Sequence, residues 1–278
     1  FEGSVFTGRE ALNPGGSSAF SGYSRSNDFS VVGSDSVVSG WSEGFSFTVD
    51  RSASGSVSGG NLGGKLTASM GAGNDYIVDA LFKDTDSVDM GAGDDKVHLT
   101  NRASTYQGAP TLSALDMAKL DGGAGTDTLH IGNNSAAVEL NLTFGGATNF
   151  ENLWASETAE VIRGDSGANL ISGKGGADTM YGGSGNDVIV SGDGYSYFDS
   201  SNYTYEANQH STNDILYGEA GNDILVGTGG SNTLDGGTGS DTIYSGGGSD
   251  TIVLRVGDGG STLADADTIT DFADGSDK

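Results

Sequence analysis

The sequence predicts an all-β solenoid, because a nine-residue glycine- and aspartate-rich pattern recurs along the chain. Glycine makes up 49 of the 278 residues, about 18%, whereas an average protein contains about 7%. Within the pattern, an acidic or amide residue recurs at position 6 and a large apolar residue at position 8. One apolar residue per nine cannot form a core alone, so the units must stack as coils whose strands pair in parallel.

The repeat is densest between residues 164 and 253. Residues 164–190 divide into GDSGANLIS, GKGGADTMY and GGSGNDVIV, and residues 218–253 into GEAGNDILV, GTGGSNTLD, GGTGSDTIY and SGGGSDTIV. QHSTNDILY, at 209–217, keeps the second half of the pattern, and isolated upstream copies begin at Met70, Met90 and Gly122. Position 8 is apolar in all eleven units, which has a chance probability of about 10⁻⁵ at an apolar fraction of 35%.

Position 6 supplies the candidate metal ligands. They are Asp75, Asp95, Asp127, Asp178, Asp187, Asp214, Asp223, Asp241 and Asp250, with Asn169 and Asn232 in the two remaining units. Ca²⁺ takes oxygen from carboxylates and carbonyls, and glycine-rich turns expose carbonyls. No His or Cys recurs in the frame, so zinc and copper fit poorly, and Mg²⁺ is the weaker candidate because it retains several waters. Several Ca²⁺ ions are therefore expected.

For three of these candidates, a plain surface role remains open because their neighbouring units are degenerate: Asp75, Asp95 and Asp127. For Asp84, Asp86 and Asp89, which lie outside the frame, a solvated surface is the favoured interpretation. Scattered surface charge has no nine-residue phase, and this separates the regular set from such acids.

The units resemble the RTX family of secreted bacterial proteins, whose motif is GGxGxDxUx with U large and apolar. GGSGNDVIV from Gly182 and GGTGSDTIY from Gly236 match every defined position. The resemblance implies a right-handed parallel β-roll in which two nonapeptides make one coil and Ca²⁺ lies between turns. It also implies shared ions between alternate units, pairing Asn169 with Asp187, Asp178 with Asp214, Asp187 with Asp223, Asp214 with Asn232, Asp223 with Asp241, and Asn232 with Asp250. The sites containing Asn are expected to bind more weakly.

Charge and composition exclude several classes. The 38 acidic residues outnumber the 12 basic ones, and a net charge of −26 leaves no electrostatic footprint for nucleic acid or an anionic membrane. The absence of cysteine excludes disulfides, thiolate metal sites and a cysteine nucleophile. No run of about 18 apolar residues is present, so no transmembrane helix is expected.

No catalytic constellation is recognisable, so the chain is not expected to be an enzyme. It has no His-Glu-x-x-His motif. The one G-x-S-x-G, centred on Ser42, lacks the strand–turn–helix context of a nucleophile elbow. Two histidines, His98 and His130, fall at position 9, where alternation points side chains outward, and His210 lies in an interruption of the repeat.

Three segments are expected. Residues 1–65 are Ser/Gly-rich and predicted to be irregular β structure; residues 66–160 are degenerate β-roll or β-helix coils with one short helix at 111–120 and strands near 138–144 and 150–154. Residues 161–278 are the β-roll, with a loop insertion at 191–213 and a closing segment at 254–278.

Two function classes remain open. One is a Ca²⁺-rigidified extracellular module of a surface adhesin or surface-layer-type assembly; the other is the non-catalytic secretion and folding module of a type I-secreted hydrolase or toxin. The tyrosine-rich loop 191–213 either packs on the roll or recognises a cell-surface polysaccharide or protein. Exposed strand edges also make self-assembly a candidate.

Overall fold

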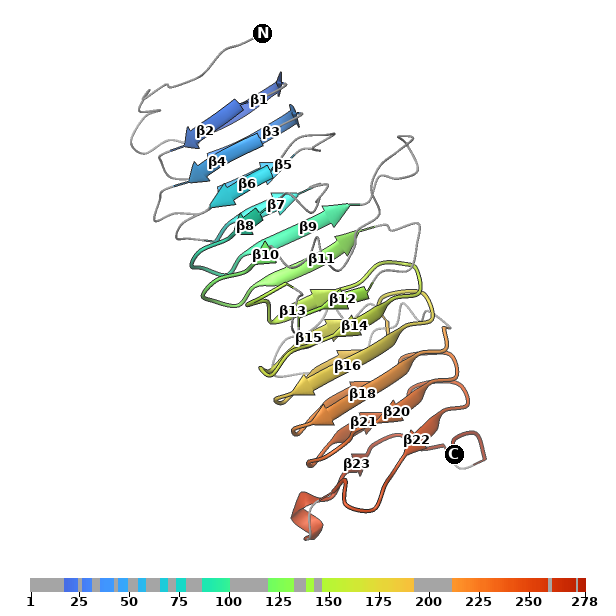
Figure 1. The fold of residues 1–278 in the computed structure, drawn as a ribbon. Helices are drawn as coiled ribbons and strands as arrows, with labels where there is room; N and C mark the ends of the chain where they lie inside the picture. Colours follow the sequence, from blue (N-terminus) through green and yellow to red (C-terminus); the bar gives the residue numbers. More distant parts are fainter. Residues whose placement is uncertain are drawn as a thin grey trace. The chain divides into compact units, whose positions relative to one another are not determined.

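The chain folds as stacked coils of parallel β-strands in the computed structural model (Figure 1). The structure describes residues 18–24, 27–31, 36–42, 45–49, 55–58, 66–69, 74–78, 87–100, 120–132, 139–142, 147–192, 212–259, 262–273 and 275–278. These residues contain no α-helix and one short 3-10 helix, η2 (Leu263–Asp265). Almost all regular structure is strand and the sheets do not close on themselves, which confirms the all-β, parallel β-roll prediction.

The chain divides into two compact units, residues 1–135 with 144–150, and residues 136–143 with 151–278. In the first unit, one sheet contains, in order, β1 (Ser18–Ser24), β3 (Ser36–Ser42), β5 (Gly55–Ser58), β7 (Tyr76–Val78), β9 (Lys96–Thr100) and β11 (Thr128–Gly132). The other contains β2 (Asn27–Val31), β4 (Phe45–Val49), β6 (Leu66–Ser69), β8 (Ser87–Asp89) and β10 (Leu120–Asp121).

The strands described within residues 1–65 pair in parallel from coil to coil, with steps of unequal length. Ser18 pairs with Ser36, and Asn27 pairs with Phe45, so each of these steps is 18 residues long. This is the length of two nonapeptides. The next steps are 19 residues, from Ser36 to Gly55, and 21 residues, from Phe45 to Leu66, so coils form here without the glycine–aspartate motif and without its strict period.

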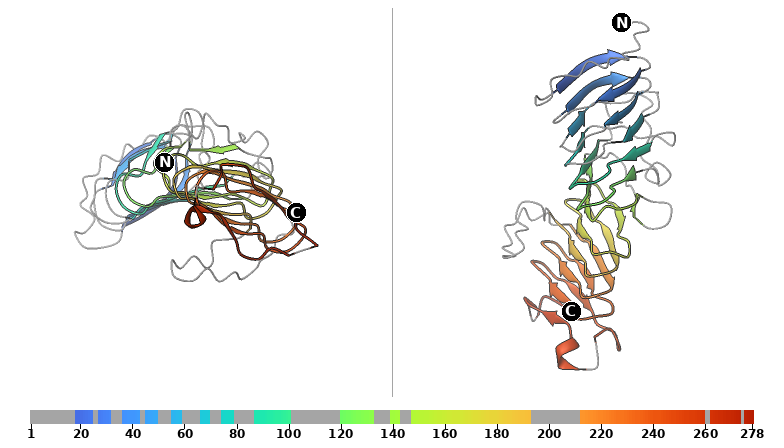
Figure 2. Two further views of the ribbon diagram at one scale, coloured as in Figure 1. Left: turned by 90° about the horizontal axis from the view of Figure 1, so that it is seen from below. Right: turned by 90° about the vertical axis from the view of Figure 1, so that its left-hand side faces the viewer.

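In the second unit, each nonapeptide contributes one strand, and successive nonapeptides alternate between two sheets (Figures 1 and 2). One sheet orders β13 (Asn152–Trp154), β15 (Leu170–Ser172), β17 (Val188–Val190), β19 (Ile224–Val226), β21 (Thr242–Tyr244) and β23 (Thr268–Ile269). The other orders β12 (Glu139–Asn141), β14 (Val161–Arg163), β16 (Thr179–Ser184), β18 (Ile215–Ala220), β20 (Thr233–Asp235) and β22 (Thr251–Val253). Two nonapeptides thus make one coil.

The core of the roll is the row of position-8 side chains. In the second unit, Ile252 of the last nonapeptide is partly exposed. The other members of the row there are fully buried, namely Ile171, Met180, Ile189, Leu216, Leu225, Leu234 and Ile243. The residues at position 7 of the same strands are partly exposed, as alternation along a strand requires. Burying one such apolar side chain contributes about 1.5–3 kcal/mol, so the inner row holds the two sheets together.

Glycine is required where the chain turns between strands. In the nonapeptide that begins at Gly236, Gly237 has φ 92° and Gly239 has φ 143°, which favour glycine over any residue with a Cβ. A Cβ on Gly239 would also collide with the carbonyl oxygen of Gly221 in the preceding coil. The turns therefore stack backbone on backbone, and their carbonyl groups come close together.

Some sequence predictions fall beyond the described part of the chain. Most of the tyrosine-rich loop 191–213 and all of the 111–120 helix prediction except Leu120, which lies in strand β10, are outside the described residues. The division into three segments at 65 and 160 stays a prediction. No helix within the described ranges is long and apolar enough to cross a membrane.

Candidate metal centre

The position-6 side chains form a ladder along the roll. The Oδ1 atom of Asp187 accepts the backbone N–H of Asn169 at 2.7 Å, Asp223 accepts that of Asp187 at 2.7 Å, and Asp241 accepts that of Asp223 at 2.8 Å. On the other side of the roll the same bond joins Asp178 to Asp214, Asp214 to Asn232, and Asn232 to Asp250. All six residue pairs named from the sequence therefore lie in consecutive coils.

The second carboxylate oxygen has no hydrogen-bond partner in four glycine-headed nonapeptides. These are the buried Oδ2 atoms of Asp178, Asp187, Asp223 and Asp241. Each faces the position-1 glycine of its own nonapeptide, which is Gly173, Gly182, Gly218 or Gly236. The orphaned oxygen therefore recurs with the repeat, and in these four nonapeptides it adjoins a residue without a side chain.

A backbone carbonyl of the next coil faces the same space. A Cβ placed on Gly173 would lie 2.7 Å from Oδ2 of Asp178 and 2.8 Å from the carbonyl oxygen of Ser191. A Cβ on Gly218 would collide with both Oδ2 of Asp223 and the carbonyl oxygen of Gly236. Glycine thus leaves open a volume lined by oxygen atoms, and we call this volume the glycine cradle.

Burial disfavours the ionised form of the carboxylates of the ladder. Desolvation raises the pKa of Asp178 to about 8, that of Asp223 to about 7 and that of Asp187 to about 6, with the neighbouring acids adding to the rise. It also raises the pKa of Asp241 and Asp250. Near neutral pH such a group is stabilised by a proton or by a cation.

The cradle fits a hard cation better than a soft one. Its donors are carboxylate and carbonyl oxygens, the ligands that Ca²⁺ prefers. The described residues contain no group of three or more His, Cys, Asp or Glu side chains placed to hold a metal ion. An ion in a cradle would therefore take much of its coordination from backbone carbonyls.

Asn232 completes its turn differently. Its Oδ1 atom accepts the backbone N–H of Asp214 at 2.9 Å, as an aspartate of the ladder would. Its Nδ2 atom donates to the carbonyl oxygen of Gly227 at 2.6 Å and reaches that of Gly229 at 3.3 Å. The amide donor thus occupies the side of the cradle where an aspartate would present Oδ2. This geometry gives a physical reason for the weaker binding expected of a site that contains Asn232.

Three members of the ladder were not predicted from the sequence. Glu160 donates its N–H to Oδ1 of Asp178 at 2.7 Å, whereas Asp267 and Asp277 accept the N–H groups of Asp241 and Asp250 at 3.0 and 3.1 Å. The signal for Glu160 is ASETAEVIR at 155–163, which keeps positions 6 and 8 but has no glycine.

The carboxylate of Glu160 is satisfied within its own turn. Its Oε1 atom accepts the hydroxyl of Ser156 at 2.6 Å and that of Thr158, and its Oε2 atom accepts the N–H of Ser156 at 3.3 Å. Hydroxyl and amide donors here compensate a buried carboxylate without a cation.

The ladder is also present in the first unit. Oδ1 of Asp95 accepts the N–H of Asp75 at 2.6 Å, and Oδ1 of Asp127 accepts that of Asp95 at 2.7 Å. All three aspartates are buried, whereas Asp89, interpreted as a surface acid, is exposed. Asp84 and Asp86 lie outside the described residues.

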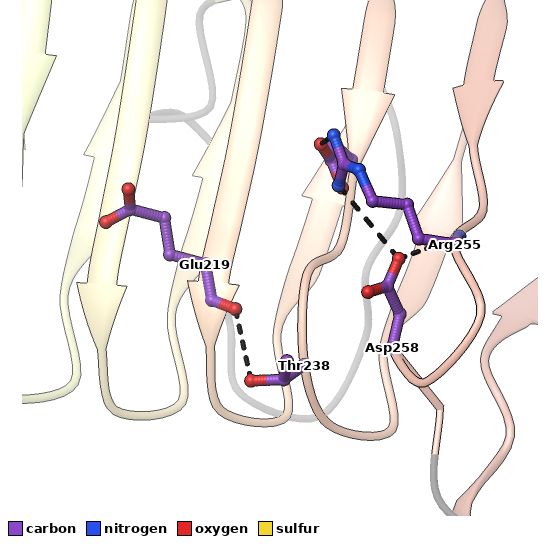
Figure 3. A network of polar contacts seen from close by, with 5 residues as sticks. Glu219, Thr238, Arg255 and Asp258 are labelled. Atoms are coloured by element: carbon purple, nitrogen blue, oxygen red, sulfur yellow. Dashed lines mark hydrogen bonds and ion pairs between the residues drawn. The ribbon is translucent and has the colours of Figure 1, made fainter.

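The closing segment adds an ion pair near the last turns. Arg255 contacts Asp235 of β20 through two nitrogens at 2.5 and 2.6 Å, and its backbone N–H donates to Asp258 at 2.8 Å (Figure 3). In the neighbouring turns, the hydroxyl of Thr238 donates to the carbonyl oxygen of Glu219 at 3.4 Å. The ion pair between Arg255 and Asp235 ties the segment after β22 back to the preceding coil.

The side chains considered for catalysis have structural surroundings. β4 begins at Phe45, three residues after Ser42, so no nucleophile-elbow helix follows this serine. His98 and His130 face each other across β9 and β11 with ring centroids 4.2 Å apart, and both are half-buried rather than fully exposed. His210 lies outside the described residues.

Fold and turns together define a parallel β-roll whose turns are lined with oxygen ligands. A family model described as RTX calcium-binding nonapeptide repeat matches residues 154–197, 211–234 and 226–260, in four copies. This part of the chain is therefore an RTX repeat segment, a structural calcium-binding module that is not itself catalytic. Such repeats typically occur in secreted proteins. No curated protein matches the chain.

Proposed function

We propose that the glycine cradles of residues 164–253 each hold Ca²⁺ between consecutive coils, and that this part of the chain folds when it meets extracellular calcium. The observation that carries the proposal is the recurring buried Oδ2 atom, without a hydrogen bond, that faces a carbonyl of the next coil across a glycine. Ions that bind one coil to the next would make the roll a rigid module.

The energetics favour folding coupled to calcium. Without a cation, each buried carboxylate must take up a proton or remain charged next to its neighbours, and both raise the free energy of the fold near neutral pH. If free Ca²⁺ is about tenfold above the Kd, each site adds about 1.4 kcal/mol, so several sites approach the whole stability of a domain.

The extracellular space supplies the calcium that such modest sites require. Extracellular calcium-binding modules work with a Kd of about 10⁻⁴–10⁻³ M, a concentration that the cytosol does not reach. A chain with a net charge of −26 would remain extended inside the cell and fold after export. The rigid module then serves a structural or adhesive role in a surface adhesin or surface-layer-type assembly.

Far-UV circular dichroism of the full chain near neutral pH tests the calcium dependence. In EDTA the β-sheet signal of the repeat region is expected to be lost, and millimolar Ca²⁺ is expected to restore it where Mg²⁺ does not. Asp223→Asn should raise the calcium concentration at the midpoint, whereas Asp89→Asn, at an exposed acid outside the ladder, should leave it unchanged. A β spectrum that survives exhaustive chelation would reject the proposal.

A further inference from the structure

Met90 stands at position 1 of the nonapeptide MGAGDDKVH, where the strongest repeats have glycine. We propose that this methionine makes its turn calcium-free, so that an apolar side chain takes the place that Ca²⁺ has in glycine-headed turns. The inference rests on the function proposed above, and it assigns to position 1 the choice between a cation-binding and a metal-independent turn.

The backbone of this turn matches that of a glycine-headed nonapeptide. Gly91 and Gly93 have φ values of 93° and 140°, and Gly237 and Gly239 at the same positions have 92° and 143°. The acid at position 6 is also retained, because Oδ1 of Asp95 accepts the N–H of Asp75 as the other ladder members do. Backbone and ladder are thus common to both turns, and the residue at position 1 differs.

A side chain at position 1 enters the glycine cradle. In the nonapeptides headed by Gly182, Gly218 and Gly236, a Cβ at this position would collide with Oδ2 of the aspartate in the same nonapeptide. Since Gly91 and Gly93 have the φ values of their counterparts in a glycine-headed turn, the Cβ and thioether chain of Met90 should extend toward the corresponding side of Asp95. The volume that glycine leaves to a ligand is therefore taken.

Burial supports this placement. Met90 has no exposed surface and is among the largest fully buried side chains, while Oδ2 of Asp95 is buried and has no hydrogen-bond partner. Methylene groups and a thioether sulfur offer no oxygen ligand, and soft sulfur is a poor partner for Ca²⁺. A side chain of this type adds to the apolar core instead, which holds the coil without metal.

The next coil in the same unit of the structure provides a comparison. Gly122 heads the nonapeptide that contains Asp127, and a Cβ on Gly122 would collide with the carbonyl oxygen of Asn149 and lie 2.8 Å from Cβ of Asp127. That turn keeps glycine at position 1 with a carbonyl oxygen facing it. The inference therefore assigns Asp95 to a calcium-free turn and Asp127 to a cation-binding turn.

Calcium stoichiometry of the full chain, measured by equilibrium dialysis at saturating Ca²⁺, tests the inference. Met90→Gly is expected to bind one more ion per chain than the wild type, and Met90→Leu, which keeps an apolar side chain, the same number. The added ion should disappear in Met90→Gly/Asp95→Asn. In the wild-type background, Asp95→Asn should leave the number of bound ions unchanged. This second test does not depend on whether Met90→Gly folds.

Two results would overturn the inference: a loss of one ion on Asp95→Asn in the wild-type background, or no added ion in a folded Met90→Gly. Both presuppose a wild-type chain that binds Ca²⁺ at its other turns, so they leave the proposed function standing. A wild-type chain that binds no Ca²⁺ would instead overturn the proposed function, and this inference with it.

Discussion

At the scale of single residues, the absence of a side chain at position 1 matters as much as the carboxylate at position 6. The carboxylate of Asp223 uses one oxygen to bind the backbone of the preceding coil and leaves the other buried without a hydrogen bond. Gly218 keeps the space in front of that oxygen open. Under the proposed function, a nonapeptide that carries both residues offers Ca²⁺ the complete oxygen-lined cradle.

Gly218→Ala should remove calcium from this turn and destabilise the roll. The added Cβ would collide with Oδ2 of Asp223 and with the carbonyl oxygen of Gly236, so the cradle must close or the coils must separate. We expect one fewer bound ion per chain and a loss of about 1–3 kcal/mol from overpacking, with the cation's contribution lost in addition. Isothermal titration with Ca²⁺ and urea unfolding measure the two effects.

Gly247→Ala is the matched control, because no atom lies within 4 Å of a Cβ placed there. It should keep the wild-type number of ions and the wild-type unfolding midpoint. An unchanged calcium stoichiometry in Gly218→Ala would contradict the role assigned to position 1.

At the scale of strands and turns, the sequence alone predicted the regular part well. In nonapeptides such as GGSGNDVIV the apolar residue at position 8 and the glycines around the turn both have a nine-residue period, and β17 forms where that period places it. The expected strands near 138–144 and 150–154 are present as β12 and β13.

Other elements lacked such a signal. Strands β1 to β5 pair from coil to coil without the glycines of the motif, so the repeat frame could not be recognised there. Glu160 was missed because its nonapeptide has no glycine, although Ser156 and Thr158 supply hydrogen bonds to its carboxylate. The hydrogen bond from the amide of Asn232 to Gly227 depends on the orientation of the Asn232 side chain. Composition and repeat spacing do not specify that orientation.

At the scale of the whole molecule, the fold concentrates acidic groups that resist ionisation. Desolvation by burial raises the pKa of Asp95 and Asp223 to about 7 and that of Asp178 to about 8, against an ordinary value of 3.8. Protons and calcium therefore compete for the same oxygens. Under the proposed function, a chain with a net charge of −26 needs one or the other to remain folded.

Stability without calcium should fall as the pH rises. Between pH 4 and 8 the folded chain holds protons that the unfolded chain has already released, because the pKa values of Asp187, Asp223 and Asp178 are raised to about 6, 7 and 8. The stabilisation is complete below the pKa that these aspartates have in the unfolded chain. It is lost as the pH rises through their higher pKa values in the folded chain. In EDTA we therefore expect a cooperative melt at pH 5, and at pH 8 a lower Tm or a repeat region that is already unfolded.

At saturating Ca²⁺ the Tm should instead be higher at pH 8 than at pH 5, since deprotonated carboxylates bind the ion. Thermal melts followed by circular dichroism at several pH values, with EDTA and with Ca²⁺, provide the comparison. A Tm in EDTA that is constant or rises between pH 5 and 8 would contradict the assignment of buried, protonated aspartates.

The positions of calcium ions in a crystal structure of the calcium-loaded chain test the central claim most directly. We predict an ion above Gly173, Gly182 and Gly218, about 2.3–2.6 Å from Oδ2 of the aspartate in the same nonapeptide and from a carbonyl oxygen of the next coil. Aspartates 178, 187 and 223 that keep bare Oδ2 atoms in a crystal grown at millimolar Ca²⁺ would contradict it.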